Sequence, residues 1–173
     1  MNRILILITL GFLITGCSEN KMEKKESEVI EISESEEQKA LARLSFLVGN
    51  WKGQSTIYSK DSVKTAQVSE RVKYLLDGNL LTLDVKSPFI QLHTVIRYSA
   101  KDSTYYYHPF TNTSEGKAYK GRIENGKFIV LFNDNYKVIF ERTEDGKFHE
   151  YGERIVNGKK EMSFEDLLEP VSE

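Results

Sequence analysis

The sequence predicts an all-β domain: an up-and-down antiparallel β-barrel of about ten strands, with a short N-terminal helix. Four two-residue pairs favour tight hairpin turns: Asp77-Gly78, Asn125-Gly126, Asp145-Gly146 and Asn157-Gly158. The runs between the turns are short and rich in β-branched and aromatic residues, with no room for crossover helices. Consecutive hairpin-linked strands leave two vulnerable edges unless the sheet closes on itself. Closure therefore favours a barrel, and a two-sheet sandwich is the main alternative.

The domain is predicted to open with a helix over residues 36–47. Ser35 or Ser33 can cap its start. The apolar residues of one helix face recur at a spacing of three: Leu41, Leu44 and Leu47. Gly49 follows and ends the helix, and beyond it the apolar spacing becomes that of strands.

The ten predicted strands lie between the turn signals. Their ranges are 50–58, 63–76, 79–86, 91–99, 103–109, 116–123, 127–132, 136–143, 147–156 and 159–168. A barrel of about eight strands is filled by its own side chains or holds one small ligand. Ten strands can therefore leave an interior cavity.

The first sixteen residues have the features of a secretory signal peptide: a basic start, an apolar run over 4–14 and small residues before Cys17. The run is shorter than the roughly 20 residues that span a bilayer. Ile14-Thr15-Gly16-Cys17 resembles the bacterial lipobox, although an ordinary signal with an incidental cysteine is the alternative. The resemblance implies a multiply acylated Cys17 that anchors the protein in the bacterial cell envelope, outside the cytoplasm. Because Ser18 stands where an aspartate often signals inner-membrane retention, the outer membrane is expected if the cell has one.

Three segments follow from this pattern: a signal peptide at 1–16, the lipidated cysteine with a flexible charged tether at 17–36, and the barrel domain at 37–169. Between Ser18 and Lys39 there are eight glutamates, four lysines and no aromatic residue. Such a stretch cannot bury enough apolar surface to fold alone. The net charge of −2 gives no electrostatic reason to expect nucleic acid, and a single cysteine excludes an internal disulfide.

The segment Phe-Leu-Val-Gly-Asn-Trp-Lys-Gly at 46–53 resembles the opening of lipocalin-like (calycin) barrels. It resembles still more strongly the bacterial lipocalin-like proteins grouped as a DUF1579-type domain of unknown function. Residues 70–78, 98–105 and 152–165 resemble, in order, the second strand, the central region and the closing hairpin of that family. The resemblance implies the barrel fold and structural roles for Gly49, Trp51 and Gly53, with the tryptophan closing one end under the helix.

The chain departs from this family at Lys159-Lys160, where the last hairpin often carries a tryptophan. The fold therefore transfers better than any detail of a site. Nitrobindin-like haem barrels share the same opening but ligate iron through a histidine near the C-terminus. The last histidine here is His149, so neither haem nor any other cofactor is expected.

Glu70 is the clearest polar residue on an otherwise apolar strand face. Every second residue of a strand lies on the same face, and Glu70 shares its face with Ala66, Val68, Val72, Tyr74 and Leu76. The opposite face of this strand is wholly polar. Glu70 is therefore predicted to point inward, where a carboxylate is costly unless it is paired. It is either half of a structural ion pair with Arg97 or Arg154, or a polar anchor for a ligand.

Other residues with ligand-binding chemistry lie on the fourth, fifth and ninth strands. Together with Glu70, the predicted ligand-binding set is Tyr74, His93, Arg97, Tyr105, Tyr107, Tyr151 and Glu153. The alternation leaves open which face of 91–99 points inward. No nucleophile–base–orienter trio and no metal-ligand spacing is present, so neither a catalytic residue nor a metal site is predicted.

These observations predict a membrane-anchored lipoprotein that binds a small, largely apolar molecule in the barrel interior. One alternative is a packed barrel that acts as an interaction module in the envelope. Another is an isomerase- or hydrolase-like enzyme that uses Glu70 with tyrosines and His93 or His108. Fold alone does not decide among them.

Overall fold

The computed structural model describes residues 33–114 and 116–172, which form one barrel with a short helix. The signal peptide and lipidated Cys17 predicted from the sequence lie outside the described residues. The elements are α1 (Glu36–Ala42), the 3-10 turn η1 (Ser45–Leu47), β1 (Gly49–Ser59), β2 (Ser62–Leu75), β3 (Leu80–Lys86), β4 (Gln91–Ser99), β5 (Thr104–Phe110), β6 (Tyr119–Glu124), β7 (Lys127–Asn133), β8 (Tyr136–Arg142), β9 (Phe148–Val156) and β10 (Lys159–Pro170).

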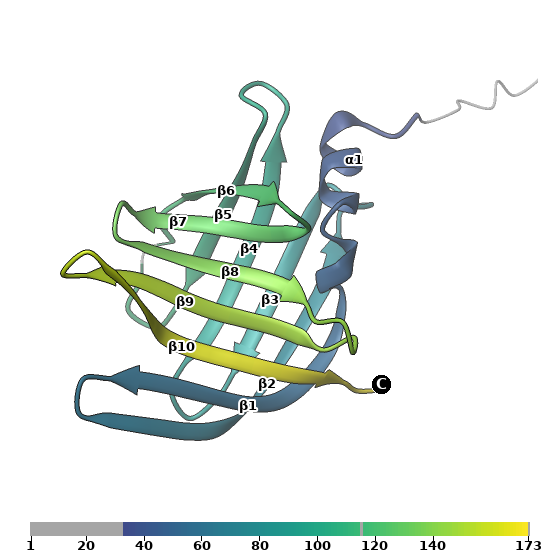
Figure 1. Ribbon diagram of the computed structural model, residues 1–173. Coiled ribbons are helices and arrows are strands. Elements are labelled where there is room, and N and C mark those ends of the chain that lie inside the picture. Colours follow the sequence, from purple (N-terminus) through teal and green to yellow (C-terminus); the bar gives the residue numbers. More distant parts are fainter. Residues whose placement is uncertain (1–32, 115, 173) are drawn as a thin grey trace, which may run out of the picture. The chain divides into compact units, whose positions relative to one another are not determined.

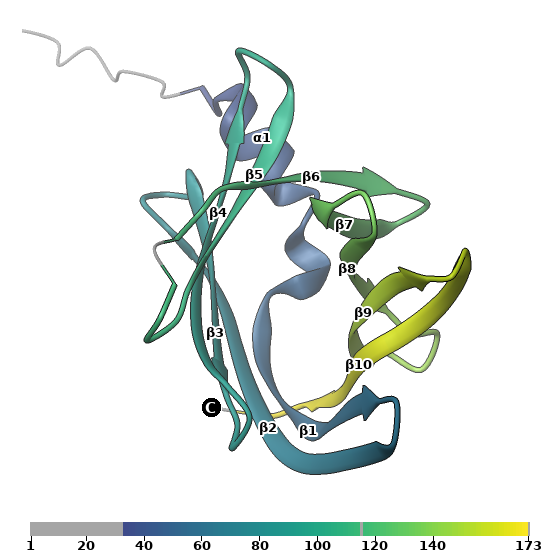
Figure 2. The same cartoon turned by 90° about the vertical axis from the view of Figure 1, so that its left-hand side faces the viewer.

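The ten strands form a closed antiparallel barrel (Figure 1). Every strand pairs with its neighbour along the chain, and β1 pairs with β10 from Trp51–Pro170 to Ile57–Phe164. Figure 2 shows the strands curving around the interior, with β10 beside β1. The predicted up-and-down barrel is thus confirmed, and the two-sheet alternative does not form.

Strand boundaries differ from the predicted ones where the backbone enters the left-handed region. Leu76 has φ 50°, so β2 ends at Leu75, and the Leu76 side chain is 69 % exposed instead of joining the inner face. Gly116 has φ 73°, and β6 begins only at Tyr119. Of the four predicted two-residue turns, those at 125–126 and 157–158 form as predicted, with both φ angles positive, whereas the other two pairs lie in longer connections.

The helix α1 begins with a capping box. Ser35 accepts a hydrogen bond from the Gln38 amide, and the Gln38 side chain accepts one from the Ser35 amide. The Gln38 side chain also donates to the backbone oxygen of Asp77 in the β2–β3 turn, at 2.7 Å. The predicted helix over 36–47 is interrupted at Arg43 and continues as η1. Both pieces lie at the end of the barrel that carries the β2–β3 turn.

The Gly-x-Trp-x-Gly segment joins the helical opening to the barrel. The Trp51 side chain is 2 % exposed, stacks on Phe148 at 5.6 Å and donates to the Leu47 backbone oxygen at 2.9 Å. A Cβ at Gly53 would overlap the backbone oxygen of Leu167, because β10 crosses β1 closely there. The structural roles predicted for Trp51 and Gly53 are therefore explained by the burial of the indole and by the close approach of β10 to β1.

The half of the interior nearest the helix is fully packed. Phe128, Phe140 and Phe148 are essentially unexposed and contact one another in a row. The Tyr105 hydroxyl donates to the Ala40 backbone oxygen at 2.7 Å, which ties this packed half to α1. None of the helices within residues 33–114 and 116–172 is long and apolar enough to cross a membrane.

Candidate ligand-binding site

An apolar cavity of about 530 Å³ occupies the other half of the interior. Successive turns of an up-and-down barrel alternate between its two ends, and the helix belongs to the end with the β2–β3 turn. Phe89 and Ile90 of the β3–β4 connection line the cavity, as do Thr111 and Ser114 of the β5–β6 connection. The cavity therefore faces the end of the barrel opposite the helix.

Aliphatic and aromatic side chains make up most of the cavity wall. They are Ile57, Val85, Phe89, Ile90, Leu92, Tyr107, Pro109, Tyr119, Phe132, Tyr136, Val138 and Phe164. The few other polar contributors are Ser55, Thr111, Ser114, Glu150, Ser163 and Asp166. A wall of this kind, with a few convergent polar groups, is typical of small-molecule sites of 300–1,000 Å³.

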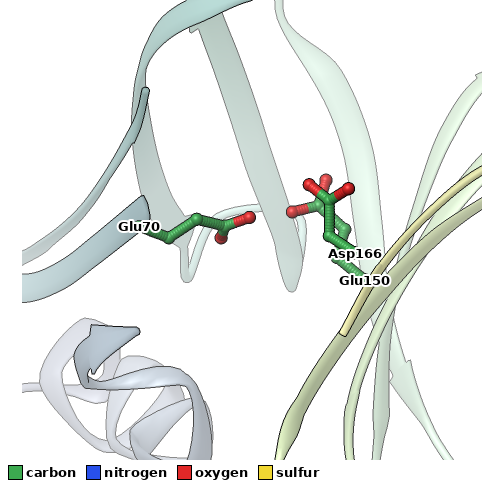
Figure 3. A group of neighbouring side chains, drawn as sticks. All are labelled: Glu70, Glu150 and Asp166. Carbon is green, nitrogen blue, oxygen red and sulfur yellow. The ribbon is translucent and has the colours of Figure 1, made fainter. Parts of the chain in front are cut away.

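Three acidic side chains meet inside the barrel. Glu70 of β2 points across the interior toward Glu150 of β9 and Asp166 of β10, which are register partners on adjacent strands (Figure 3). One carboxyl oxygen from each lies within 4.8 Å of the other two. The residues are 2 %, 5 % and 5 % exposed, respectively. We call Glu70, Glu150 and Asp166 the carboxyl cluster.

The carboxyl cluster lies between the packed half of the interior and the cavity. Glu70 pairs across the strands with Trp51, the residue under the helix, whereas Glu150 and Asp166 line the cavity wall. Asp166 is also the register partner of Ser55, another cavity-lining residue. The cluster therefore presents carboxyl oxygens to the inner end of an apolar space.

Burial sets the charge state of the carboxyl cluster. Burial raises the pKa of Glu70 well above its ordinary value, and the negative charges of Glu150 and Asp166 add to the effect. Burial, together with the charge of Asp166, likewise raises the pKa of Glu150 well above the usual range. The pKa of Asp166 is raised by burial, although hydrogen bonds with Ser55 and with Glu70 oppose the shift. The unliganded cluster therefore retains protons that exposed carboxyls would release.

Several carboxyl oxygens of the cluster lack hydrogen-bond donors. Among the described residues, Oε2 of Glu150 has no hydrogen-bond partner, and the oxygens of Glu70 and Oδ1 of Asp166 have none outside the contact between the Glu70 and Asp166 carboxyl groups. Ionised carboxylates are acceptors only, so the three groups bond one another only through the protons that burial retains, as between Glu70 and Asp166, and Oε2 of Glu150 still lacks a donor. Unpaired buried acceptors are costly, which makes the cluster a feature that a bound donor would stabilise.

The predicted ligand-binding residues divide between the two faces of the barrel. Glu70 belongs to the carboxyl cluster and Tyr107 lines the cavity. Tyr105 and Tyr74 donate hydrogen bonds to backbone oxygens of α1, so both serve the closed end. Of the predicted residues, the structure thus places only Tyr107 in the cavity wall and only Glu70 in the carboxyl cluster.

The other four predicted residues lie on the outer face. In β4, Thr94 and Ile96 are buried on the inner face, so His93 and Arg97 lie on the outer face. There His93 forms a hydrogen bond with Asp84, and the Arg97 guanidinium lies over the Tyr106 ring. In β9, Tyr151 stacks on His149 and Glu153 pairs with Lys137. Since strand residues alternate between faces, none of the four lines the interior cavity.

Two sequence-based partnerships of Glu70 do not form. Arg97 lies outside the barrel and Arg154 pairs with Glu161, so the ion-pair alternative for Glu70 is wrong for both arginines. Carboxyl groups, not cations, face Glu70. His93 and His108 both lie on the opposite strand face from Glu70, which leaves the proposed enzyme arrangement without its histidine.

Sequence reasoning missed Glu150 and Asp166. The signal that identified Glu70 was present for Asp166, which shares its strand face with Phe164 and Leu168, but not for Glu150, whose face holds Phe148 together with Arg154. The more polar face of the ninth strand, with Tyr151 and Glu153, drew attention away from them. A carboxyl on an apolar face was therefore a useful criterion on β2 and β10.

No protein-family model matches this chain, and no curated protein matches it significantly. The resemblance to lipocalin-like and DUF1579-type barrels therefore stays a prediction from the sequence motifs. The structure by itself supplies the fold of the chain: a closed ten-stranded antiparallel barrel, packed at one end and hollow at the other.

Proposed function

We propose that this chain is a membrane-anchored lipoprotein whose barrel binds a small, largely apolar molecule in its interior. The observation that carries the proposal is the 530 Å³ cavity with its wall of aliphatic and aromatic side chains. A space of that size surrounded by apolar groups gains free energy when an apolar molecule leaves water to fill it, at about 25 cal/mol per Å² buried.

The same observation weighs against the two alternatives. A barrel that serves only as a scaffold for surface interactions has no use for a hollow half, since unfilled volume weakens packing. An enzyme using Glu70 with His93 or His108 requires those side chains on one strand face, whereas they lie on opposite faces. Ligand binding, in contrast, accounts for the apolar cavity inside the barrel.

Nile red, a neutral apolar dye, tests this proposal on the chain from Ser18 to Glu173. We expect saturable fluorescence enhancement with one dye per chain. Ile57→Trp should weaken dye binding about tenfold or more, because the indole occupies cavity volume that the dye would otherwise fill. Gln54→Trp, on the exposed outer face of the same strand, is the matched control and should leave binding unchanged. Absence of saturable binding to the unaltered chain would refute the proposed function.

The anchoring half of the proposal rests on Cys17 and the apolar segment before it. One acyl chain gives only marginal membrane binding, whereas several anchor a protein stably, at about 0.8 kcal/mol per buried CH₂. We expect that Cys17→Ser abolishes incorporation of an alkyne-labelled fatty acid and moves the protein from the membrane to the soluble fraction. Ser18→Ala is the control and should keep both properties. Labelling that persists in Cys17→Ser would show that the lipid, if any, is elsewhere.

A further inference from the structure

We infer that the ligand carries a primary or secondary amine, whose ammonium group the carboxyl cluster of Glu70, Glu150 and Asp166 binds at the inner end of the cavity. This inference rests on the proposed ligand-binding function and specifies the chemistry of the ligand. The ligand class is an amphiphilic amine, with an apolar body in the cavity and a cationic end at the cluster.

The first argument is the convergence of unpaired acceptors. Glu70 reaches the cluster from one wall of the barrel, and Glu150 and Asp166 reach it from the facing wall (Figure 3). All three are at least nine-tenths buried, Glu150 Oε2 has no hydrogen-bond partner among the described residues, and Glu70 and Asp166 have none at their unsatisfied oxygens except each other. A ligand that brings N–H donors would satisfy these oxygens.

The second argument is geometric. Hydrogen bonds from an ammonium to a carboxylate are about 2.8 Å long, and tetrahedral N–H directions then place three acceptors about 4.6 Å apart. The cluster offers three oxygens, one per residue, within 4.8 Å of one another. A primary ammonium has three N–H donors, so its number of donors also matches the number of carboxyl groups.

The third argument is charge. Burial and then acidic neighbours raise the pKa values of Glu70 and Glu150 with no cation contributing, and at Asp166 the only opposing cation, His149, has the smallest effect. Buried carboxylates are tolerated when they are paired with a cation. A bound ammonium would supply that charge and replace the protons that the empty cluster retains.

The cavity wall favours an organic cation over a metal ion. Calcium requires six to eight oxygen ligands and magnesium requires six, many of them often water. The cavity that Glu150 and Asp166 line is walled by apolar groups such as Val85, Val138 and the Tyr107 ring, with the Ser55 hydroxyl among its few polar groups. An amine attached to an apolar body satisfies the carboxyl groups and this apolar wall with one molecule.

A matched pair of probes tests the inference: 2-(1-naphthyl)ethylammonium and the neutral 2-(1-naphthyl)ethanol, each competing with Nile red. The two probes share one apolar body and differ in the terminal group. We expect the ammonium to bind about tenfold or more tightly than the alcohol, as hydrogen bonds to charged groups imply. Glu150→Gln and Glu70→Gln should each reduce this preference to less than about threefold, because each removes one negative charge from the cluster.

Glu153→Gln is the control, since Glu153 lies on the outer face of β9 and pairs with Lys137. It should retain the full preference for the ammonium. Circular dichroism would establish that each variant is folded, and the alcohol serves as an internal reference for the cavity in every variant.

The outcomes separate this inference from the function on which it rests. If Nile red fails to bind, the proposed function falls. If Nile red binds but ammonium and alcohol compete equally, only the ammonium assignment falls. Calcium or manganese tested alone provides the remaining arm: thermal stabilisation by a divalent ion that Glu150→Gln abolishes, with no ammonium preference, would assign the cluster to a metal instead.

Discussion

Trp51→Ala is expected to lower the free energy of unfolding by about 3–5 kcal/mol, the usual cost of removing a large buried aromatic side chain. The indole is 2 % exposed, stacks on Phe148 and donates to the Leu47 backbone oxygen. Its loss would leave a void under the helix and an unpaired carbonyl. Urea unfolding followed by circular dichroism measures the effect.

Val63→Ala provides the comparison for this experiment. Val63 is 62 % exposed on β2, so its truncation should change stability by no more than about 0.5 kcal/mol. A loss below about 1 kcal/mol in Trp51→Ala would contradict the role assigned to the tryptophan in closing the barrel.

The stability of the unliganded protein is expected to fall as pH rises from about 5 to about 8. Burial raises the pKa of Glu70 and of Glu150 well above the ordinary glutamate value of 4.5. Above that value, the unfolded chain releases these protons while the folded chain keeps them, so the folded state binds more protons. Each such group lowers the unfolding free energy by up to about 1.4 kcal/mol per pH unit until its folded pKa is reached.

Glu70→Gln should flatten this pH dependence and make the protein more stable than the unaltered chain at the alkaline end, because it removes a buried carboxyl with no cationic partner. Glu153→Gln serves as the control. Its neighbour Lys137 lowers the pKa of Glu153 despite the opposing effect of partial burial, so its contribution is lost only as pH falls through that lowered value. Stability that stays constant or rises over this range in the unaltered chain would show that the cluster is not a proton-retaining group.

The fold could be predicted from the sequence because its determinants are local. The Asn125-Gly126 and Asn157-Gly158 pairs adopt the positive φ angles that two-residue hairpins need. Ten short runs joined by turns leave a meander as the only simple topology, and unpaired edges favour its closure. The errors were also local: Leu76 left the strand because its backbone adopts φ 50°, which residue type alone does not indicate.

The site was only partly predictable, because it depends on which strands face one another across the barrel. Alternation identified Glu70 as an inward carboxyl on a single strand. It could not show that Glu150 and Asp166, 80 and 96 residues further along the chain, reach the same point. The sequence therefore suggested an arginine as one possible partner for Glu70, because a buried carboxylate is usually paired with a cation. In the folded barrel Glu70 instead lies beside the carboxyl groups of Glu150 and Asp166.

The alternation of strand faces also accounts for the outer-face residues. His93 and Arg97 occupy the face opposite to Thr94 and Ile96, and both sets carry enough apolar character to be core candidates. Pairing with β3 and β5 decides the orientation, since Leu83 and Tyr107 on those strands are buried. Such information comes from the neighbouring strands and not from the strand itself.

The most direct test of the central claim is a crystal structure of the chain from Ser18 to Glu173 grown with 2-(1-naphthyl)ethylammonium. The account predicts electron density for the naphthalene ring among Ile57, Phe132 and Phe164, with its nitrogen within hydrogen-bond distance of Glu150 and Asp166. A barrel whose own side chains fill that space, with the ligand absent or bound only on the outer surface, would contradict it.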